Sequence, residues 1–170
     1  MAAIAAKEMK LREKKMPNNI NNHLSVEGDA NEIAEFFKKA ASGAKELDFE
    51  TFVSVPDDLE DDWDLIALWG TDRNCYEVEV DLQNCIVFFQ TAYNFPSPVL
   101  EEMSAQFPNL VFTDRWVDEY GEILGIVRCQ NGECELLSED TEEAKAWRET
   151  CHQKEKEWLE NWELFKTTRS

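Results

Sequence analysis

Residues 75–82, CYEVEVDL, decide the fold expected for this chain. Apolar and acidic side chains alternate along this stretch, as they do in a strand with one face on a core and the other in water. The inward-facing residues would be Tyr76, Val78, Val80 and Leu82. After a turn at residues 83–84, the stretch CIVFFQTAY at 85–93 is apolar on both faces, which is typical of a central strand. Together they predict two strands joined by a short turn.

The chain on either side of these strands predicts more strands and two helices. We expect strands at 22–28 and 48–56, a helix from Asp29 to about Ala41, a helix from about Pro98 to Gln106 capped by Ser97, and two strands within 109–129 joined by a turn at 120–122. This order indicates an α+β fold. Its closest familiar arrangement is a ferredoxin-like antiparallel sheet with two helices on one face.

A long C-terminal helix is predicted beyond this sheet. Residues 138–165 contain neither Gly nor Pro, and Ser138 is followed by acidic residues suited to a helix start. The apolar residues of this helix would share one narrow face: Ala144, Trp147, Cys151, Trp158, Trp162 and Phe165. Three exposed Trp side chains would be costly, so the helix packs on its own domain, pairs with a second copy or docks on a partner. For the last two cases, Trp147, Trp158 and Trp162 are the candidate binding residues.

Three parts of the chain are expected: a basic leader at 1–15, a domain at 16–135 and the C-terminal helix at 136–170. The leader, MAAIAAKEMKLREKK, has five Lys and Arg against two Glu, a net charge of +3. Because the whole chain carries −19, the remainder carries −22. The leader is either an unstructured extension or a basic arm that folds back on the acidic surface or touches a partner.

Composition limits the classes of function. A chain of 170 residues with 43% hydrophobic residues is long enough to bury one core. Its charge of −19 disfavours direct binding to nucleic acid or to an anionic membrane and favours a basic protein partner. We find no run of about 20 apolar residues, the length of a membrane span, and expect a cytoplasmic protein. The five cysteines do not have the pattern of a secreted disulfide framework.

Signals for catalysis or metal binding are weak. His23 and His152 have no nucleophile or carboxylate partner evident in the sequence, and we expect both at the surface or at an edge. Cys129 and Cys134 with Cys151 and His152 form at most a poor zinc pattern. No calcium loop or glycine-rich phosphate loop is present. We therefore expect no enzyme, no cofactor, no metal and no catalytic residue.

The densest charge lies in residues 56–64, PDDLEDDWD, which place six carboxylates in nine positions. With three earlier acidic residues they form the candidate partner-binding patch: Glu46, Asp48, Glu50, Asp57, Asp58, Glu60, Asp61, Asp62 and Asp64. Duplex DNA carries one negative charge per roughly 1.7 Å of its axis. A rigid face of carboxylates can therefore occupy a basic groove that normally binds phosphates.

Several motifs carry a family resemblance. They are MPNNINNHLSVEGD at 16–29, FETFVSVPDDL at 49–59, LWGTD at 68–72, FFQTAYNFPSPVLEEMSAQFPNLVF at 88–112 and DEYGEILGIVRCQNGE at 118–133. Over residues 16–135 the chain resembles the ferredoxin-like domain of the Api-type and YubB-type proteins of plasmids and phages. The leader and the C-terminal helix lie outside the resemblance, and Asp72-Arg73 stand where the family usually has Lys-Trp. The resemblance implies the fold and a mobile-element origin, but no activity.

These observations lead to one main functional hypothesis. Proteins of phages and plasmids often disarm host defences, so we expect an acidic DNA mimic that inhibits a CRISPR or restriction type system in the bacterial host cell by binding a basic nucleic-acid-binding protein or complex. Two alternatives stay open. One is an oligomeric scaffold or adaptor, including a homodimer, that acts through the Trp-rich helix. The other is a carboxylate-dependent metal enzyme.

Overall fold

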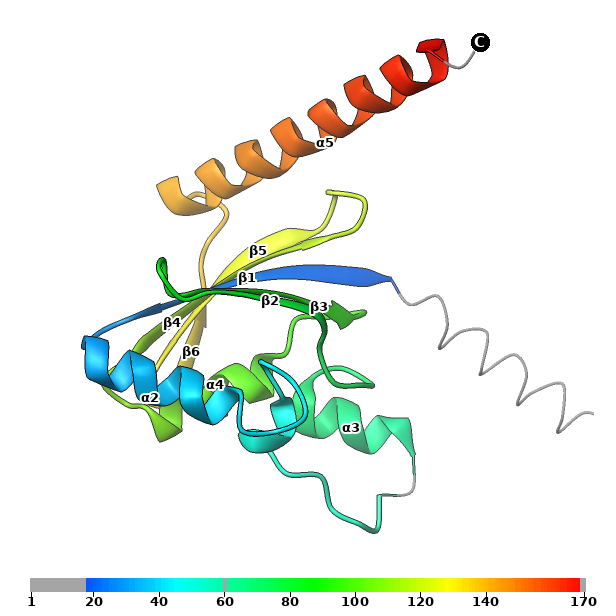
Figure 1. Cartoon of the computed structure of the whole chain (residues 1–170). Helices are drawn as coiled ribbons and strands as arrows, with labels where there is room; N and C mark the ends of the chain where they lie inside the picture. Colours follow the sequence, from blue (N-terminus) through cyan, green and yellow to red (C-terminus); the bar gives the residue numbers. More distant parts are fainter. Residues whose placement is uncertain (1–17, 60, 169–170) are drawn as a thin grey trace, which may run out of the picture.

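The structure, a computed structural model, describes residues 18–59 and 61–168, and in 158–159 and 161–168 it describes the backbone alone. Figure 1 shows a sheet with helices on both faces. The elements follow the chain in this order: β1 (Asn19–Glu27), α2 (Ala30–Ala40), the 3-10 helix η1 (Phe49–Thr51), α3 (Asp62–Trp69), β2 (Tyr76–Asp81), β3 (Ile86–Ala92), α4 (Ser97–Gln106), β4 (Val111–Asp118), β5 (Leu124–Gln130), β6 (Glu133–Leu136) and α5 (Glu142–Thr168).

One antiparallel sheet organises the domain. Its strand order is β2-β3-β1-β4-β5-β6, so β1 pairs with β3 on one side and with β4 on the other. Helices α2, α3 and α4 lie on one face of this sheet, and α5 lies on the opposite face (Figure 1). The predicted α+β ferredoxin-like arrangement is confirmed, with α2 and α4 as the two predicted helices on one face.

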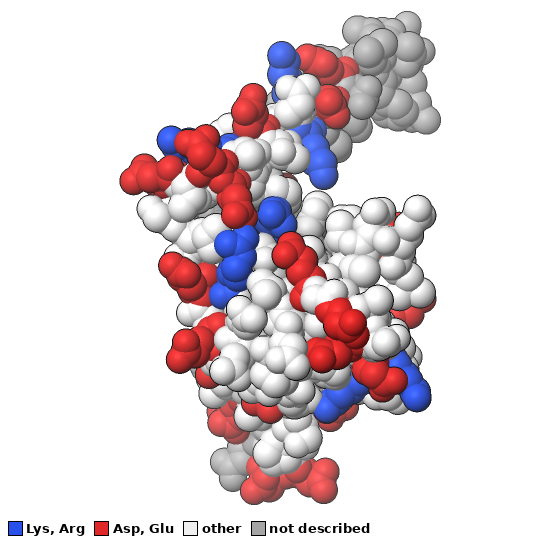
Figure 2. Space-filling model, turned by 90° about the vertical axis from the view of Figure 1, so that its left-hand side faces the viewer, with Lys and Arg blue, Asp and Glu red and all other residues white. Residues whose placement is uncertain are grey.

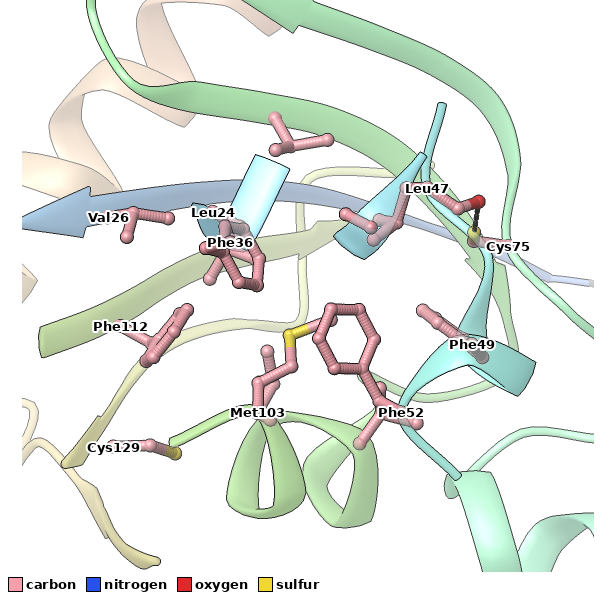
Figure 3. Close-up of a cluster of buried hydrophobic side chains, with 14 of the residues drawn as sticks. Leu24, Val26, Phe36, Leu47, Phe49, Phe52, Cys75, Met103, Phe112 and Cys129 are labelled. Carbon is pink, nitrogen blue, oxygen red and sulfur yellow. Dashed lines mark hydrogen bonds between the residues drawn. The ribbon is translucent and has the colours of Figure 1, made fainter. Parts of the chain in front are cut away.

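The main core fills the space between the sheet and helices α2 and α4. Along β1, every second side chain is buried, and Leu24 and Val26 point into this layer (Figure 3). Phe36 of α2 packs in the same layer, with its ring centroid 5.0 Å from that of Phe112 on β4. Met103 reaches the same layer from α4. Each such buried side chain stabilises the fold by roughly 1.5 to 3 kcal/mol, which is what holds the helices to the sheet.

The prediction of a strand at 48–56 is wrong, because this stretch forms η1 and a loop. Phe49 and Phe52 are both buried, and their spacing of three residues suits one helical turn rather than the two-residue repeat of a strand. Asp48 caps the turn: its carboxylate accepts a hydrogen bond of 3.0 Å from the backbone N–H of Glu50. A local cap therefore overrides the β-branched and aromatic composition of the segment.

Helix α3 was not predicted from the sequence. It begins after Asp61 and ends at Gly70, whose φ of 81° is the left-handed conformation that favours glycine at a helix end. The C-terminal end of α3 is anchored, because Trp69 is buried and its Nε1 donates a 3.0 Å hydrogen bond to the carbonyl of Val53. The N-terminal end of α3 starts inside the acidic stretch.

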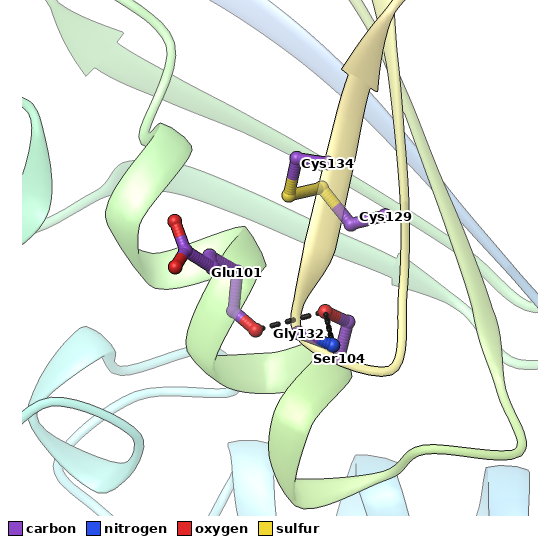
Figure 4. The surroundings of a disulfide bond; sticks show 5 residues. All are labelled: Glu101, Ser104, Cys129, Gly132 and Cys134. Atoms are coloured by element: carbon purple, nitrogen blue, oxygen red, sulfur yellow. Dashed lines mark hydrogen bonds between the residues drawn. A yellow bond between two sulfur atoms is a disulfide. The ribbon is translucent and has the colours of Figure 1, made fainter.

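Strand β6 and a disulfide were also not predicted. Cys129 on β5 and Cys134 on β6 face one another in the strand register, and their sulfur atoms are bonded (Figure 4). The turn between the two strands is held from α4, since the hydroxyl of Ser104 accepts a 3.0 Å hydrogen bond from the Gly132 N–H and donates to the carbonyl of Glu101. With their sulfurs bonded to each other, these two cysteines do not form the weak zinc pattern considered from the sequence.

Candidate functional site

The acidic stretch surrounds the N-terminal end of α3. Asp57, Asp58, Asp61 and Asp64 are exposed, and Asp62 is partly buried. Glu60 lies outside the described residues. Asp61 is the helix cap: its carboxylate accepts hydrogen bonds of 3.0 and 3.3 Å from the backbone N–H groups of Trp63 and Asp64. These five predicted site residues lie in one short stretch of the chain, hereafter the acidic segment (residues 57–64).

Part of this crowding has a local explanation. The first turn of a helix presents unpaired N–H groups and the positive end of the helix dipole, so carboxylates there are stabilising. Asp61 satisfies two of those N–H groups, and Asp62 and Asp64 lie in the first turn. Asp57 and Asp58 precede the helix and gain nothing from this effect, because the effect falls off within a turn. The helix start therefore does not account for the charge of Asp57 and Asp58.

An exposed tryptophan lies among these carboxylates. The side chain of Trp63 is 76% exposed, and Ile66, one helical turn further on, is 38% exposed. Large aromatic side chains are rarely left in water without a function, and Trp is enriched at the centres of protein interfaces. The sequence prediction omitted Trp63. The sequence signal available for it was weak: a tryptophan within a run of carboxylates.

Within residues 18–59 and 61–157, no lysine or arginine forms an ion pair with Asp57, Asp58, Asp61 or Asp64. Within the described residues, the ion pairs are Arg73–Asp72, Arg115–Glu143, Arg128–Glu143, Lys145–Glu142 and Arg148–Glu139. Figure 2 shows the face at the left of Figure 1, where basic side chains stand between acidic ones near α5. At the lower end of that view, at the height of the loop before α3 in Figure 1, acidic side chains gather with no basic one among them.

Of the three earlier acidic residues, Asp48 is a wrong prediction. It is only 6% exposed and accepts hydrogen bonds from Asn74 Nδ2 at 2.8 Å and from the backbone N–H of Ala44 at 3.2 Å. Burial acts to raise the pKa of Asp48, but these hydrogen bonds outweigh it and lower the pKa, so the carboxylate stays charged as a structural cap. Glu46 and Glu50 are exposed, but Glu46 borders a groove lined by α2 and β2.

Trp147 is also a wrong prediction as a partner-binding residue. It is 6% exposed and lies with Cys151 against Ile126 on the face of the sheet opposite the main core. Its Nε1 donates a 3.1 Å hydrogen bond to the carbonyl of Trp116. The first part of α5 therefore packs on its own domain, one of the three alternatives left open by the sequence. The side chains of Trp158 and Trp162 lie outside the described residues.

His23 is not at an edge or on the surface, as the sequence had suggested. It lies on the central strand β1, half-buried, with its ring 4.8 Å from that of Phe88 and 5.1 Å from that of Trp147. Burial, with the positive charges of Lys154 and Arg115, lowers the pKa of His23 to about 4. His23 is therefore neutral at pH 7, and its ring packs between Phe88 of the sheet and Trp147 of α5. His152 is exposed, as expected.

The described residues contain neither a cluster of metal ligands nor a membrane-spanning helix. In residues 18–59 and 61–157, no group of three His, Cys, Asp or Glu side chains is placed to hold a metal ion. Over the described part of the chain, no helix has both the length and the apolar composition needed to cross a membrane.

The comparisons with known proteins identify the family alone. No curated protein and no solved structure matches this chain. The model of the ferredoxin-like domain in Api92-like proteins matches residues 69–163, from the end of α3 into α5. The C-terminal helix, which the resemblance had left outside, is therefore largely inside the matched region. Because the match covers more than half of the chain, the protein belongs to the family of ferredoxin-like domains in Api92-like proteins.

Proposed function

We propose that this protein is a non-enzymatic inhibitor, encoded by a phage or another mobile element, whose acidic segment occupies a basic nucleic-acid-binding surface of a host defence protein. The observation that supports it best is the exposure of four carboxylates of the acidic segment, those of Asp57, Asp58, Asp61 and Asp64, beside an exposed Trp63. We expect the inhibitor to act inside the bacterial host cell.

The geometry of α3 favours rigid presentation of these charges. Trp69 and Gly70 fix the C-terminal end of the helix, and the Asp61 cap fixes its N-terminal end. A charge held in place loses little side-chain or backbone entropy on binding, so more of the interaction energy appears as affinity. Charges of one sign also steer a basic partner toward this end of the molecule and raise the association rate at low salt.

Trp63 gives the surface an element that phosphates lack. A lysine or arginine of a basic groove can lie on its indole ring while pairing with Asp61 or Asp64, which would combine cation–π and ionic attraction. Truncation of a central interface Trp typically costs more than about 2 kcal/mol of binding energy. We therefore assign Trp63 as the anchor of the contact and the carboxylates as its charged surroundings.

The scaffold alternative has one observation in its favour. Helix α5 runs past the edge of the sheet in Figure 1, whereas its described contacts come from its first part, at Ala144, Trp147 and Cys151. A homodimer through the rest of α5 is therefore the second candidate. Gel filtration of the intact chain against a chain ending at residue 157 tests it, because a dimer that depends on this part would be lost only in the shortened chain.

The inhibitor proposal is tested by capture from bacterial extract at low salt, with the full chain immobilised. We expect basic nucleic-acid-binding proteins to be retained and to be released by added duplex DNA, because both would occupy the same surface. A chain with Asp57, Asp58, Asp61 and Asp64 changed to Asn should retain at least about tenfold less, as expected when several desolvated charges are lost. Asn preserves the helix cap at position 61.

A variant with the same change in net charge controls for nonspecific attraction. Glu27, Glu101, Glu133 and Glu135 are exposed residues outside the acidic segment, and all four can be changed to Gln. This variant should retain the captured proteins as the unmodified chain does. Equal loss in both variants, or capture that duplex DNA does not affect, would show that the acidic segment is not a nucleic-acid mimic.

A further inference from the structure

A groove of about 710 Å³ lies on the sheet face that carries α5, far from the acidic segment. Its floor is the sheet, with Asn21, Phe88 and Val117 from three neighbouring strands. One wall is α5, through Trp147 and the residues one to two turns beyond it, and the other is the turn between β4 and β5 at 119–122. A mostly apolar and aromatic floor thus lies between two polar walls.

The rim of this groove is strongly acidic. Glu77, Glu119, Glu122 and Glu155 are all exposed lining residues, and they come from β2, from the β4–β5 turn and from α5. A Cβ built on Gly121 would lie 3.4 Å from Glu155 Oε2, so the turn and the helix approach each other at this point. Among the described lining residues, Lys154 is the basic one. An occupant should therefore be cationic, with apolar groups for the floor.

The chain itself enters the domain beside this rim. The backbone N–H of Glu119 donates a 3.0 Å hydrogen bond to the carbonyl of Asn19, the first residue of β1. Residues 1–15 are therefore joined, through residues 16–18, to a point next to one of the rim carboxylates. Their sequence alternates Ile4, Met9 and Leu11 with basic residues and carries a net charge of +3.

We propose that this groove is a binding site for a basic segment and that residues 1–15 of the same chain are its occupant. The Lys and Arg groups pair with the rim carboxylates, and the apolar side chains lie on the floor beside Phe88 and Trp147. Tethering makes the contact intramolecular, with an effective concentration in the millimolar range for a short connection. Weak pairwise attraction is then sufficient for occupancy.

In this proposal the two acidic surfaces of the protein have different occupants. The groove is neutralised from within the chain, while the acidic segment at α3 keeps its charge for a partner. A basic partner that competes for the groove would displace residues 1–15. This inference stands apart from the proposed function, since the two use different residues and each can fail alone.

Carbodiimide crosslinking of the full chain tests the proposal, because it joins a lysine to a carboxylate only when the two are in contact. At low salt we expect crosslinks within one chain from Lys7, Lys10, Lys14 or Lys15 to Glu119, Glu122 or Glu155. Their yield should fall at least about fivefold near 1 M salt, where the screening length drops to about 3 Å. The exposed pair Lys145–Glu142, 3.6 Å apart, is an internal check that the reaction worked.

Two variants sharpen the test. Changing Glu119, Glu122 and Glu155 to Gln should remove these crosslinks and make hydrogen exchange of residues 1–15 faster, a readout that does not depend on the crosslinked carboxylates. Changing Glu101, Glu133 and Glu135 to Gln should alter neither. Crosslinks from the basic segment to residues 57–64, crosslinks only between isotopically distinct chains, or none beside a visible Lys145–Glu142 product would each overturn the proposal.

Discussion

Trp63 and Trp147 occupy opposite sides of the sheet and opposite environments. Trp147 belongs to the apolar stripe of α5 and is 6% exposed, whereas Trp63 lies among carboxylates on α3 and is 76% exposed. Helical periodicity singled out Trp147 as a candidate binding residue, but in the structure Trp147 is buried and Trp63 is exposed. A stripe shows which residues share a face, but the nature of the neighbours decides whether that face is covered.

Carboxylates show the same contrast. Asp61 is exposed and caps α3, while Asp114 on β4 is fully buried between Leu24 and Val127 of the neighbouring strands. Within the described residues, neither carboxylate oxygen of Asp114 has a hydrogen-bond partner. Burial raises the pKa of Asp114 to about 8, so at pH 7 this group is mostly protonated.

The largest expected effect is the pH dependence caused by Asp114. An unfolded aspartate has a pKa near 3.9, so between that value and about 8 the folded chain holds a proton that the unfolded chain has lost. Stability should therefore fall as the pH rises through this window, by about 4 kcal/mol between pH 5 and pH 8. Asp114→Asn should remove most of this slope in urea unfolding, whereas Asp64→Asn should keep it. An unchanged slope in Asp114→Asn would mean that Asp114 is not buried as a neutral acid.

The next effect separates the two tryptophans directly. Trp147→Ala should lower the free energy of unfolding by about 3 kcal/mol, because it leaves a cavity and removes the hydrogen bond to the Trp116 carbonyl. Trp63→Ala should change it by less than about 0.5 kcal/mol, as is usual at an exposed position. Urea unfolding of both variants at one pH measures the difference. Similar losses in the two variants would show that Trp63 is also packed.

The smallest effect concerns the cap of α3. Asp61→Ala removes the acceptor for the N–H groups of Trp63 and Asp64 and should cost about 1 kcal/mol. Asp61→Asn keeps an acceptor and should cost only a few tenths of that amount. Hydrogen exchange of residues 62–66 reports the local stability of α3. Faster exchange in both variants alike would point to charge, rather than capping, as the role of Asp61.

Much of the sheet was predictable because its strands follow simple repeats. The two-residue alternation from Tyr76 to Asp81 and the apolar stretch that follows it are local signals, and both became strands. Leu82 was expected to face inward and is instead 67% exposed, since β2 ends at Asp81. Helix α4 was found, but the expected Ser97 cap is wrong, because the helix begins after Pro96 and has no side-chain cap.

The errors arose where distant residues decide the outcome. Asp48 is buried because Asn74, 26 positions later, donates to its carboxylate, and no local pattern shows this. Strand β6 has four exposed residues and no buried face to mark it in the sequence, and it pairs with the edge of β5. The charge of the acidic segment was visible in the sequence, but the exposure of Trp63 required knowledge of α3 and of how Trp69 holds it.

Salt elution of captured proteins tests the central claim most directly, because it measures how strongly the acidic segment holds a basic partner. Host proteins bound to the immobilised full chain are eluted with a rising salt gradient, and the same is done for Trp63→Ala and for the variant with Asp57, Asp58, Asp61 and Asp64 changed to Asn. We predict that both variants release the DNA-displaceable proteins at lower salt than the unmodified chain, while Glu27, Glu101, Glu133 and Glu135 changed to Gln release them at the original salt. Elution at one common salt concentration from every chain would contradict the assignment of this surface.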